Sequence, residues 1–180
     1  MGPQRVVIVG TAGSGKSTLA AQVAKRLDVP YVELDSLFWG AGWQPVLEDE
    51  FRRRVDEATR ADAWVIAGNY SKVMSMTFSR ADTVVWLDIP LWLCLWRIFK
   101  RTWMRWYRKE NLWGTGNYES LSRQFLDRDS LFLWVLRTHQ PRRERLMRAF
   151  AQPEYRHLRI IQLVYPWQPR QWLDVLARGE

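Results

Sequence analysis

A nine-residue stretch near the start of the chain has the composition and spacing of a phosphate-binding loop, the Walker A motif. It consists of Gly10, Thr11, Ala12, Gly13, Ser14, Gly15, Lys16, Ser17 and Thr18. Its glycines allow the backbone to turn around an anion and to direct successive N–H groups at it. In this pattern Lys16 reaches the β- and γ-phosphates of a nucleotide, and the Ser17 hydroxyl binds Mg²⁺. The stretch therefore predicts that the chain binds ATP together with Mg²⁺.

The neighbouring sequence provides the context that this loop requires. A β-branched run at residues 6–9 precedes the loop, and a helix-forming stretch at residues 19–27 follows it. A strand, a loop and a helix in this order place the phosphate at a helix N-terminus, where partial positive charge favours an anion. The stretch therefore matches the Walker A motif both in its own residues and in the strand and helix that flank it.

The rest of the chain alternates short apolar runs with helical patterns, which is typical of βαβ units and a parallel sheet. The expected strands are residues 6–9, 31–34, 64–67, 83–87 and 158–163, and the expected helices include residues 19–27, 48–60 and 170–177. About seventy residues separate the fourth strand from the fifth. The sequence thus predicts one α/β domain over residues 1–180, a P-loop NTPase with a five-stranded parallel sheet flanked by helices. Residues 91–150 are expected to form a helical lid or substrate-binding insertion between the fourth and fifth strands.

The first part of this insertion predicts a helix with two contrasting faces. Aromatic residues recur at helical spacing along one face, and arginines along nearly the opposite face. The aromatic residues are Trp92, Trp96, Phe99, Trp103 and Trp106, and the arginines are Arg97, Arg101, Arg105 and Arg108. The aromatic face could belong to the core, the arginines could bind phosphate, or the helix could lie on a membrane surface. Because a phosphate-binding loop is already present, we expect the arginines to bind phosphate.

Composition restricts the class of protein. The formal net charge of +8 suits anionic partners but does not distinguish a nucleotide from nucleic acid or a membrane surface. The single cysteine, Cys94, excludes an internal disulfide and fits a reducing compartment. No secretory signal or membrane-spanning run is evident, so we expect a cytoplasmic protein. The two histidines, His139 and His157, form no metal-ligand pattern with the acidic residues and are expected to be surface or packing residues.

The order of the motifs resembles that of the adenylate-kinase-like P-loop kinases, and most closely the bacterial group labelled FlaR-like or DNA topology modulation proteins. The segments that carry the resemblance are 10–18, 33–39, 64–70, 81–90, 112–120, 153–158 and 172–173, so it covers nearly the whole chain. The sequences ELDSLFW at 33–39 and GNY at 68–70 are more specific than the loop, which many folds share. The resemblance implies a fold and a reaction type better than it implies a substrate.

The resemblance also implies roles for particular residues. In nucleoside monophosphate kinases, the helix after the fourth strand carries two arginines four residues apart, one packed on the base and one on phosphate. Arg97 and Arg101 match that spacing. In related small-molecule kinases an aspartate after the second strand orients or deprotonates the acceptor hydroxyl, and Asp35 matches it. Its place at the carboxyl edge of the sheet agrees with this role, although an aspartate before Ser36 also suits a turn.

The chain departs from the family at the position that should help to hold Mg²⁺. The third strand of the family typically ends in Asp-Gly, whereas here that position is Ala67. Asp35 and Asp88, which follow the second and fourth strands, are the candidates to replace the missing carboxylate. Asp88 could equally cap the helix that begins near Leu91.

These observations favour a phosphotransferase that moves the γ-phosphoryl group of ATP to a nucleoside monophosphate or to the hydroxyl of another small acceptor. Its expected catalytic residues are Lys16, Asp35, Arg97 and Arg101. A nucleotide-dependent regulatory protein is the alternative that Ala67 favours. Association with DNA or with a membrane through the Trp/Arg helix is also open, but no DNA-reading module is evident.

Overall fold

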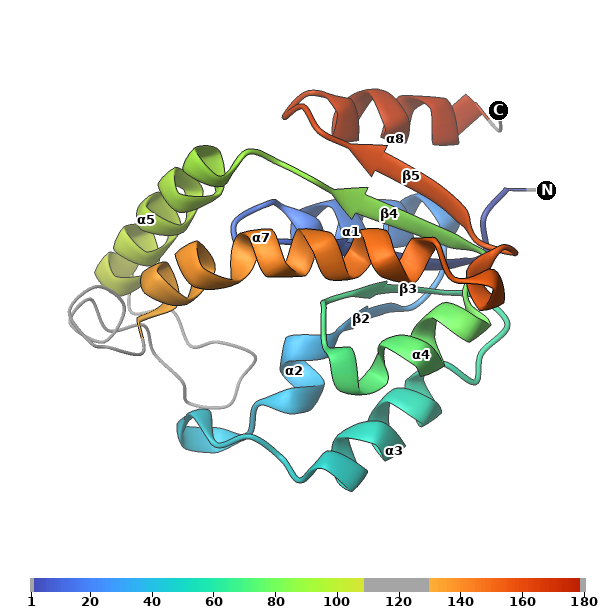
Figure 1. Cartoon of the computed structure of the whole chain (residues 1–180), viewed down its shortest axis with the longest axis horizontal. Coiled ribbons are helices and arrows are strands. Elements are labelled where there is room, and N and C mark those ends of the chain that lie inside the picture. The colour runs from blue at the N-terminus through green and yellow to red at the C-terminus, as the bar shows by residue number, and fades with distance from the viewer. Residues whose placement is uncertain (1, 109–129, 179–180) are drawn as a thin grey trace.

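The computed structural model describes residues 2–108 and 130–178 and contains a five-stranded sheet between layers of helices (Figure 1). The strands are β1 (Arg5–Gly10), β2 (Tyr31–Glu33), β3 (Trp64–Ala67), β4 (Thr83–Leu87) and β5 (Arg159–Leu163). Their order across the sheet is β2-β3-β1-β4-β5, and each neighbouring pair is parallel. The predicted α/β architecture with a five-stranded parallel sheet is confirmed.

The helices follow the strands in the alternation that the sequence predicts. They are α1 (Lys16–Leu27), α2 (Leu34–Phe38), α3 (Glu48–Ala58), α4 (Ser71–Arg80), α5 (Leu91–Arg108), α7 (Leu131–Phe150) and α8 (Gln168–Arg178), with 3-10 turns η1 (Ala41–Trp43) and η2 (Pro153–Tyr155). Helices α5 and α7 lie between β4 and β5, where the insertion is expected. Residues 109–129 of the expected lid, and with them the segment 112–120 of the resemblance, lie outside the described residues.

Side chains that alternate along the central strands fill two cores, one on each face of the sheet. On β1, Val7 and Val9 pack with residues of α3, α4 and α7, whereas Val6 and Ile8 pack with residues of α1 and α8. In Figure 1, α8 borders the sheet at the top and α3 and α4 lie below it. Because helices cover both faces, β3 and β4 are buried throughout and read as continuous apolar runs rather than as alternating ones.

Two helices lie where the sequence pattern predicts none, and both position the site. The expected second strand extends to Leu34, but β2 ends at Glu33 and α2 begins at Leu34, whose side chain is buried in the core. Helix α4 follows β3 after Gly68, a residue with a φ of +147°. A Cβ at Gly68 would lie 2.7 Å from the Leu34 Cβ. This close approach brings the segments that follow β2 and β3 together.

Helix α5 turns its aromatic residues outward. The side chains of Trp92, Trp96 and Trp103 are 69%, 57% and 52% exposed, whereas Cys94 and Ile98 on the other side of the helix are buried. The interpretation in which the aromatic face belongs to the core is therefore wrong. The smaller apolar residues Cys94 and Ile98 pack against the phosphate-binding loop instead. A stripe pattern alone does not reveal which of two apolar faces of a helix is turned inward.

Candidate active site

The loop between β1 and α1 has the geometry of an anion-binding turn at a helix N-terminus. Helix α1 begins at Lys16, and the Ser14 N–H donates to the Thr11 carbonyl at 3.0 Å within the turn. Asn69, which follows β3, holds the start of the loop. Its Oδ1 accepts from the Gly10 N–H at 3.1 Å, and its amide nitrogen donates to the Gly10 carbonyl. The strand, loop and helix that the motif requires are all in place.

Helix α5 packs directly on this loop. A Cβ at Gly13 would lie 2.3 Å from the Cys94 carbonyl oxygen and 2.9 Å from Ile98 Cγ1, so only glycine fits there. The guanidinium of Arg97 donates to the Ser14 carbonyl at 2.9 Å. Arg97, which the spacing predicts to act on the nucleotide, therefore holds the loop backbone in this structure.

The ammonium group of Lys16 lies among four charged side chains from β2, α2, α5 and α7. Burial lowers the pKa of Lys16, and the carboxylates of Asp35 and Glu33 oppose this change. The guanidinium groups of Arg101 and Arg142 lower the pKa further. The structure thus brings together three predicted site residues, Lys16, Asp35 and Arg101, and adds two that the sequence analysis does not single out. A cluster of mixed charge around the loop lysine suits the transfer of a phosphoryl group, which carries several negative charges.

Glu33 places a carboxylate beside Ala67, the position where the sequence resemblance leads one to expect an aspartate. Strands β2 and β3 pair so that Glu33 is the register partner of Ala67. Glu33 Oε2 accepts a hydrogen bond from the Tyr31 hydroxyl, whereas Oε1 is buried and has no hydrogen-bond partner among the described residues. Burial raises the pKa of the Glu33 carboxyl, and the Ser17 and Tyr31 hydroxyls partly oppose this. Ala67 itself is fully buried and faces the core of α1 and α8.

The Ser17 hydroxyl and the buried Glu33 oxygen form a donor set that fits Mg²⁺. In nucleotide sites this ion keeps several waters and binds through one or two carboxylates together with the phosphates. No group of three or more His, Cys, Asp or Glu side chains within residues 2–108 and 130–178 is arranged to hold a metal ion. In such sites the phosphates and water supply most of the ligands. Of the two carboxylates that the sequence analysis offers for this purpose, neither is the register partner of Ala67.

Asp35 is oriented by Tyr70, the third residue of the GNY segment. The Tyr70 hydroxyl donates to Asp35 Oδ1 at 2.6 Å. Burial raises the pKa of Tyr70, and the neighbouring Asp35 carboxylate raises it further, so the hydroxyl remains protonated and acts as the donor. The local turn is made instead by Ser36, whose hydroxyl donates to the Glu33 carbonyl at 2.7 Å. These contacts support a role for Asp35 toward a ligand rather than in the turn.

Helix α7 brings two further side chains to the loop. A ring nitrogen of His139 shares a hydrogen bond of 2.9 Å with the Thr11 hydroxyl, and burial lowers the pKa of His139, which favours the neutral ring. The guanidinium of Arg142 lies 4.6 Å from the ring centre of Trp134, and it is close enough to Lys16 and Asp35 to affect the electrostatics of the site. His139, expected as a surface or packing residue, thus contacts the phosphate-binding loop.

Asp88 joins three elements at the edge of the site. Its carboxylate accepts from Arg143 Nε of α7 at 3.0 Å and from Gln162 Nε2 of β5 at 2.8 Å. The Asp88 side chain is only 9% exposed. Both hydrogen bonds connect the end of β4 to later parts of the chain, and among the described contacts none shows Asp88 capping α5.

Four residues of this site, Glu33, Tyr70, His139 and Arg142, are not assigned a role by the sequence analysis. Glu33 and Tyr70 do carry a signal, because each lies near the carboxyl end of a strand, where parallel sheets bind their ligands. His139 and Arg142 carry none, because their sequence is an ordinary basic helix. Only the packing of α7 beside the loop brings them to the site.

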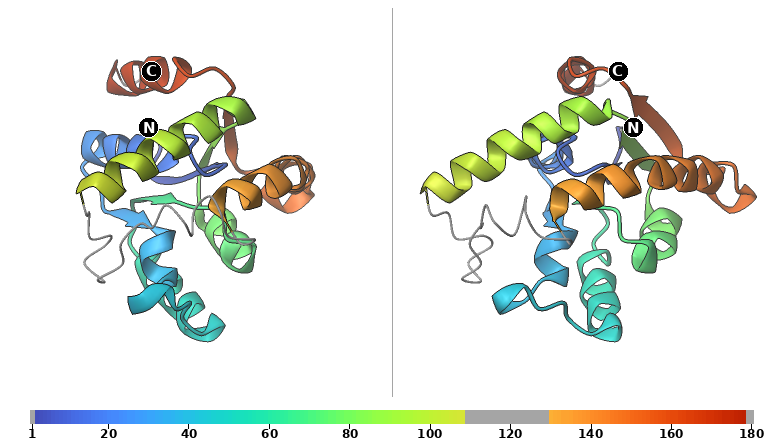
Figure 2. Two further views of the ribbon diagram at one scale, coloured as in Figure 1. Left: turned by 90° about the vertical axis from the view of Figure 1, so that its left-hand side faces the viewer. Right: turned by 60° about the vertical axis from the view of Figure 1, so that its left-hand side comes forward.

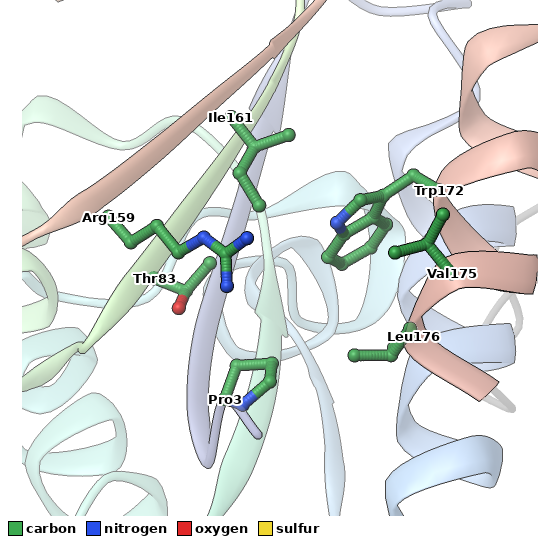
Figure 3. A pocket seen from close by; sticks show the side chains of 7 residues that line it. All are labelled: Pro3, Thr83, Arg159, Ile161, Trp172, Val175 and Leu176. Atoms are coloured by element: carbon green, nitrogen blue, oxygen red, sulfur yellow. The ribbon is translucent and has the colours of Figure 1, made fainter. Parts of the chain in front are cut away.

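A groove lies at the opposite edge of the sheet (Figure 3). It is lined by Pro3, Thr83, Arg159, Ile161, Trp172, Val175 and Leu176. Thr83 and Arg159 are the first residues of β4 and β5, so the groove adjoins the amino ends of the strands and α8. Open α/β sheets bind ligands at the carboxyl ends of their strands, which favours the loop edge as the active site.

Comparison with protein-family models and with curated proteins finds no match. Solved structures, in contrast, resemble the chain over nearly its whole length. A shikimate kinase from Bacteroides thetaiotaomicron has a TM-score of 0.56 and 18% identity, covering 98% of each chain. A gluconokinase from Sinorhizobium meliloti 1021 has a TM-score of 0.53 and 16% identity, covering 98% of this chain and 93% of its own.

A shikimate kinase from Acinetobacter baumannii, solved in complex with shikimate, also has a TM-score of 0.53 and 16% identity, covering 98% of this chain and 94% of its own. At these identities the likeness concerns the fold. The chain has the fold of the small P-loop kinases.

Proposed function

We propose that this protein is a phosphotransferase that moves the γ-phosphoryl group of ATP to a hydroxyl group of a small-molecule acceptor. One observation carries the proposal: the Tyr70 hydroxyl donates to Asp35 Oδ1 at 2.6 Å and so orients a carboxylate that acts electrostatically on the loop lysine, Lys16. Lys16 belongs to the phosphate side of the site, and Asp35 lies in the first turn of α2, directly beyond the carboxyl end of β2. A phosphate-binding lysine and an oriented carboxylate in such proximity are what transfer to a hydroxyl requires.

Each group has a task in this reaction. Asp35 accepts the proton of the acceptor hydroxyl as the oxygen attacks the γ-phosphorus, and the bond from that phosphorus to the β,γ-bridging oxygen breaks, leaving ADP. Lys16 stabilises the charge on the transferring group, and Arg101 and Arg142 add positive charge from α5 and α7. Ser17 and Glu33 would hold Mg²⁺, which neutralises charge between the β- and γ-phosphates when it is bound.

The acceptor side favours a hydroxylated metabolite with an anionic group over a nucleoside monophosphate. Arg97, which in a nucleoside monophosphate kinase would contact the nucleotide, is engaged with the Ser14 carbonyl. Arg142, which lies over Trp134 and near Asp35, can instead bind an anionic group of the acceptor while Asp35 binds its hydroxyl. The solved structures that share this fold include shikimate and gluconate kinases, whose named substrates are hydroxy acids.

Within this proposal, residues 91–150 act as the substrate-side insertion, with α5 and α7 as its described walls. Membership of the FlaR-like group is compatible with the proposed reaction and rests on the sequence resemblance. The regulatory alternative rests on Ala67, and Glu33 weakens it by supplying a carboxylate beside that position.

The experiment is an acceptor screen in which ADP release is coupled to a spectroscopic signal. The panel contains sugar acids, cyclic hydroxy acids, polyols and nucleoside monophosphates. We expect release that depends on one hydroxy-acid acceptor, and Asp35→Asn should lower turnover by about 10²–10⁴-fold with little change in ATP affinity. Asp62→Asn, an exposed aspartate before β3, is the matched control and should retain full turnover.

Acceptor-independent ATP hydrolysis, or ATP binding without turnover across the whole panel, would contradict a kinase and favour a regulatory protein. If a nucleoside monophosphate were the only acceptor that supports turnover, the proposed phosphoryl transfer would stand but the proposed class of acceptor would be refuted.

A further inference from the structure

The outward side of α5 presents six aromatic side chains to solvent. They are Trp92, Trp96, Phe99, Trp103, Trp106 and Tyr107, and they are called here the α5 aromatic face. The exposed fraction is at least 42% for every one of them. In Figure 1, α5 lies at the left-hand margin of the molecule, and in the left view of Figure 2 it crosses the front. Exposed aromatic residues in a continuous row of this kind mark an interaction surface.

We propose that the α5 aromatic face docks the protein onto a lipid membrane that contains anionic lipids. Tryptophan and tyrosine are the side chains that favour the boundary between headgroups and acyl chains. A helix that presents a row of this kind to solvent can lie along that boundary with its aromatic side buried among the headgroups. Within residues 2–108 and 130–178, no helix is long and apolar enough to cross a membrane, so α5 would lie on the surface.

Charge supports an anionic surface as the partner. The sequence of α5 contains five basic residues, Arg97, Lys100, Arg101, Arg105 and Arg108, and no acidic residue. Lys100 is exposed and lies one helical turn from both Trp96 and Trp103, at the border of the aromatic face. Arg97 lies on the inward side of the helix, where it donates to the Ser14 carbonyl, so an anionic surface would be contacted through Lys100.

Two other occupants fit the face less well. A second copy that presents the same face would bring its own Lys100 against this one, and the sequence of α5 contains no acidic residue to pair with it. A single-stranded nucleic acid needs ring faces on which bases can stack. Here the rings already face one another along the helix, with centroid distances of 6.1 Å for Trp96–Phe99 and 6.3 Å for Phe99–Trp103 and interplanar angles of 20° and 28°.

The surface is separate from the nucleotide loop. The buried side of α5 contacts the loop through Cys94, and Arg97 reaches the Ser14 carbonyl. The aromatic face points away from both of these contacts. Docking would therefore leave the loop accessible to ATP, and the inference does not depend on the proposed kinase activity.

The test is co-sedimentation of the whole protein with vesicles of phosphatidylglycerol and phosphatidylcholine in equal parts, and with vesicles of phosphatidylcholine alone. We expect sedimentation with the anionic vesicles, much less with the neutral ones, and weaker binding at high salt. Trp96→Gln combined with Trp103→Gln should weaken binding by roughly tenfold or more. Trp167→Gln is the matched control, because Trp167 is 55% exposed but lies outside α5, and it should bind like the natural protein.

Lys100→Glu provides a second variant that leaves every ring in place, and it should weaken binding to anionic vesicles only. Thermal unfolding checks that each variant is folded, which we expect because all the replaced side chains are exposed. The proposal is overturned if the natural protein stays in the supernatant with anionic vesicles, or if Trp167→Gln loses as much binding as the double variant. It is also overturned if light scattering shows a dimer that the double variant converts to monomer, or if the face binds single-stranded DNA but not vesicles.

Discussion

Replacing Gly13 with alanine should disturb the contact between the phosphate-binding loop and α5. Its φ is +81°, and a left-handed conformation costs an ordinary residue about 1–2 kcal/mol. The new Cβ would also lie 2.3 Å from the Cys94 carbonyl oxygen, a backbone atom that cannot move without α5. Overpacking of this kind costs about 1–3 kcal/mol. The reduced freedom of the unfolded chain offsets about 0.4–1 kcal/mol, so the free energy of unfolding should fall by roughly 2–4 kcal/mol.

Gly42→Ala is the matched control, because it carries the backbone cost without the collision. Gly42 has a φ of +67°, and its added Cβ would have no atom within 4 Å. Its free energy of unfolding should fall by about 1 kcal/mol or less. Urea unfolding followed by circular dichroism measures both changes. Titration calorimetry should show weaker ATP binding for Gly13→Ala, because the loop N–H groups shift, and unchanged binding for Gly42→Ala.

The reasoning is refuted if the two variants are equally stable. That result would mean that α5 does not pack on the loop as the structure has it, and the Arg97–Ser14 hydrogen bond would lose its basis as well. A larger stability loss for Gly13→Ala than for Gly42→Ala, but with intact ATP binding, would instead show that the loop still binds nucleotide after the shift.

Three further predictions concern buried charge and the thiol. Arg143→Ala should lower the free energy of unfolding by about 1–3 kcal/mol, because it removes the cation from the Asp88 carboxylate, which is only 9% exposed. Arg148→Ala is the control, because its ion pair with Glu144 is exposed. In the same denaturation assay it should change the free energy of unfolding by under about 0.5 kcal/mol. Burial raises the pKa of Glu33 above its ordinary 4.5, so the protein without Mg²⁺ should lose stability as the pH rises above that value, because the unfolded state releases the proton first. Glu33→Gln should abolish this pH dependence of stability in thermal melts, and it should also weaken Mg²⁺-dependent ATP binding. If the variant kept the pH profile of the natural protein, Glu33 would not be the group that causes it. Burial raises the pKa of the Cys94 thiol to about 11. Iodoacetamide should therefore alkylate Cys94 far more slowly in the folded protein than in urea, as mass spectrometry can measure. Rapid alkylation of the folded protein would be inconsistent with the packing of Cys94 against the loop.

Local sequence was sufficient to predict the parts of the site whose residues lie close together in the chain. Residues 10–18 predict a loop between a strand and a helix, because glycine spacing, β-branched residues and helix formers all act over a few residues. The parallel sheet follows from apolar runs separated by helical patterns. Asp35 can be placed at the ligand edge for the same reason, since it directly follows a strand.

The tertiary structure decided which residues meet across that edge. Glu33 becomes the neighbour of Ala67 only through the register of β2 against β3, and neither residue predicts the other in sequence. His139 reaches Thr11 across 128 positions of the chain, a contact set by how α7 packs rather than by any local pattern.

The faces of α5 illustrate the same division. Its sequence determined that one stripe would be aromatic and another basic, because helical periodicity is a local property. Which stripe would face inward was decided by the smaller side chains of Cys94 and Ile98, which fit against the phosphate-binding loop where tryptophan cannot. Packing, a property of the whole fold, thus turned the aromatic face to solvent and Arg97 to the phosphate-binding loop.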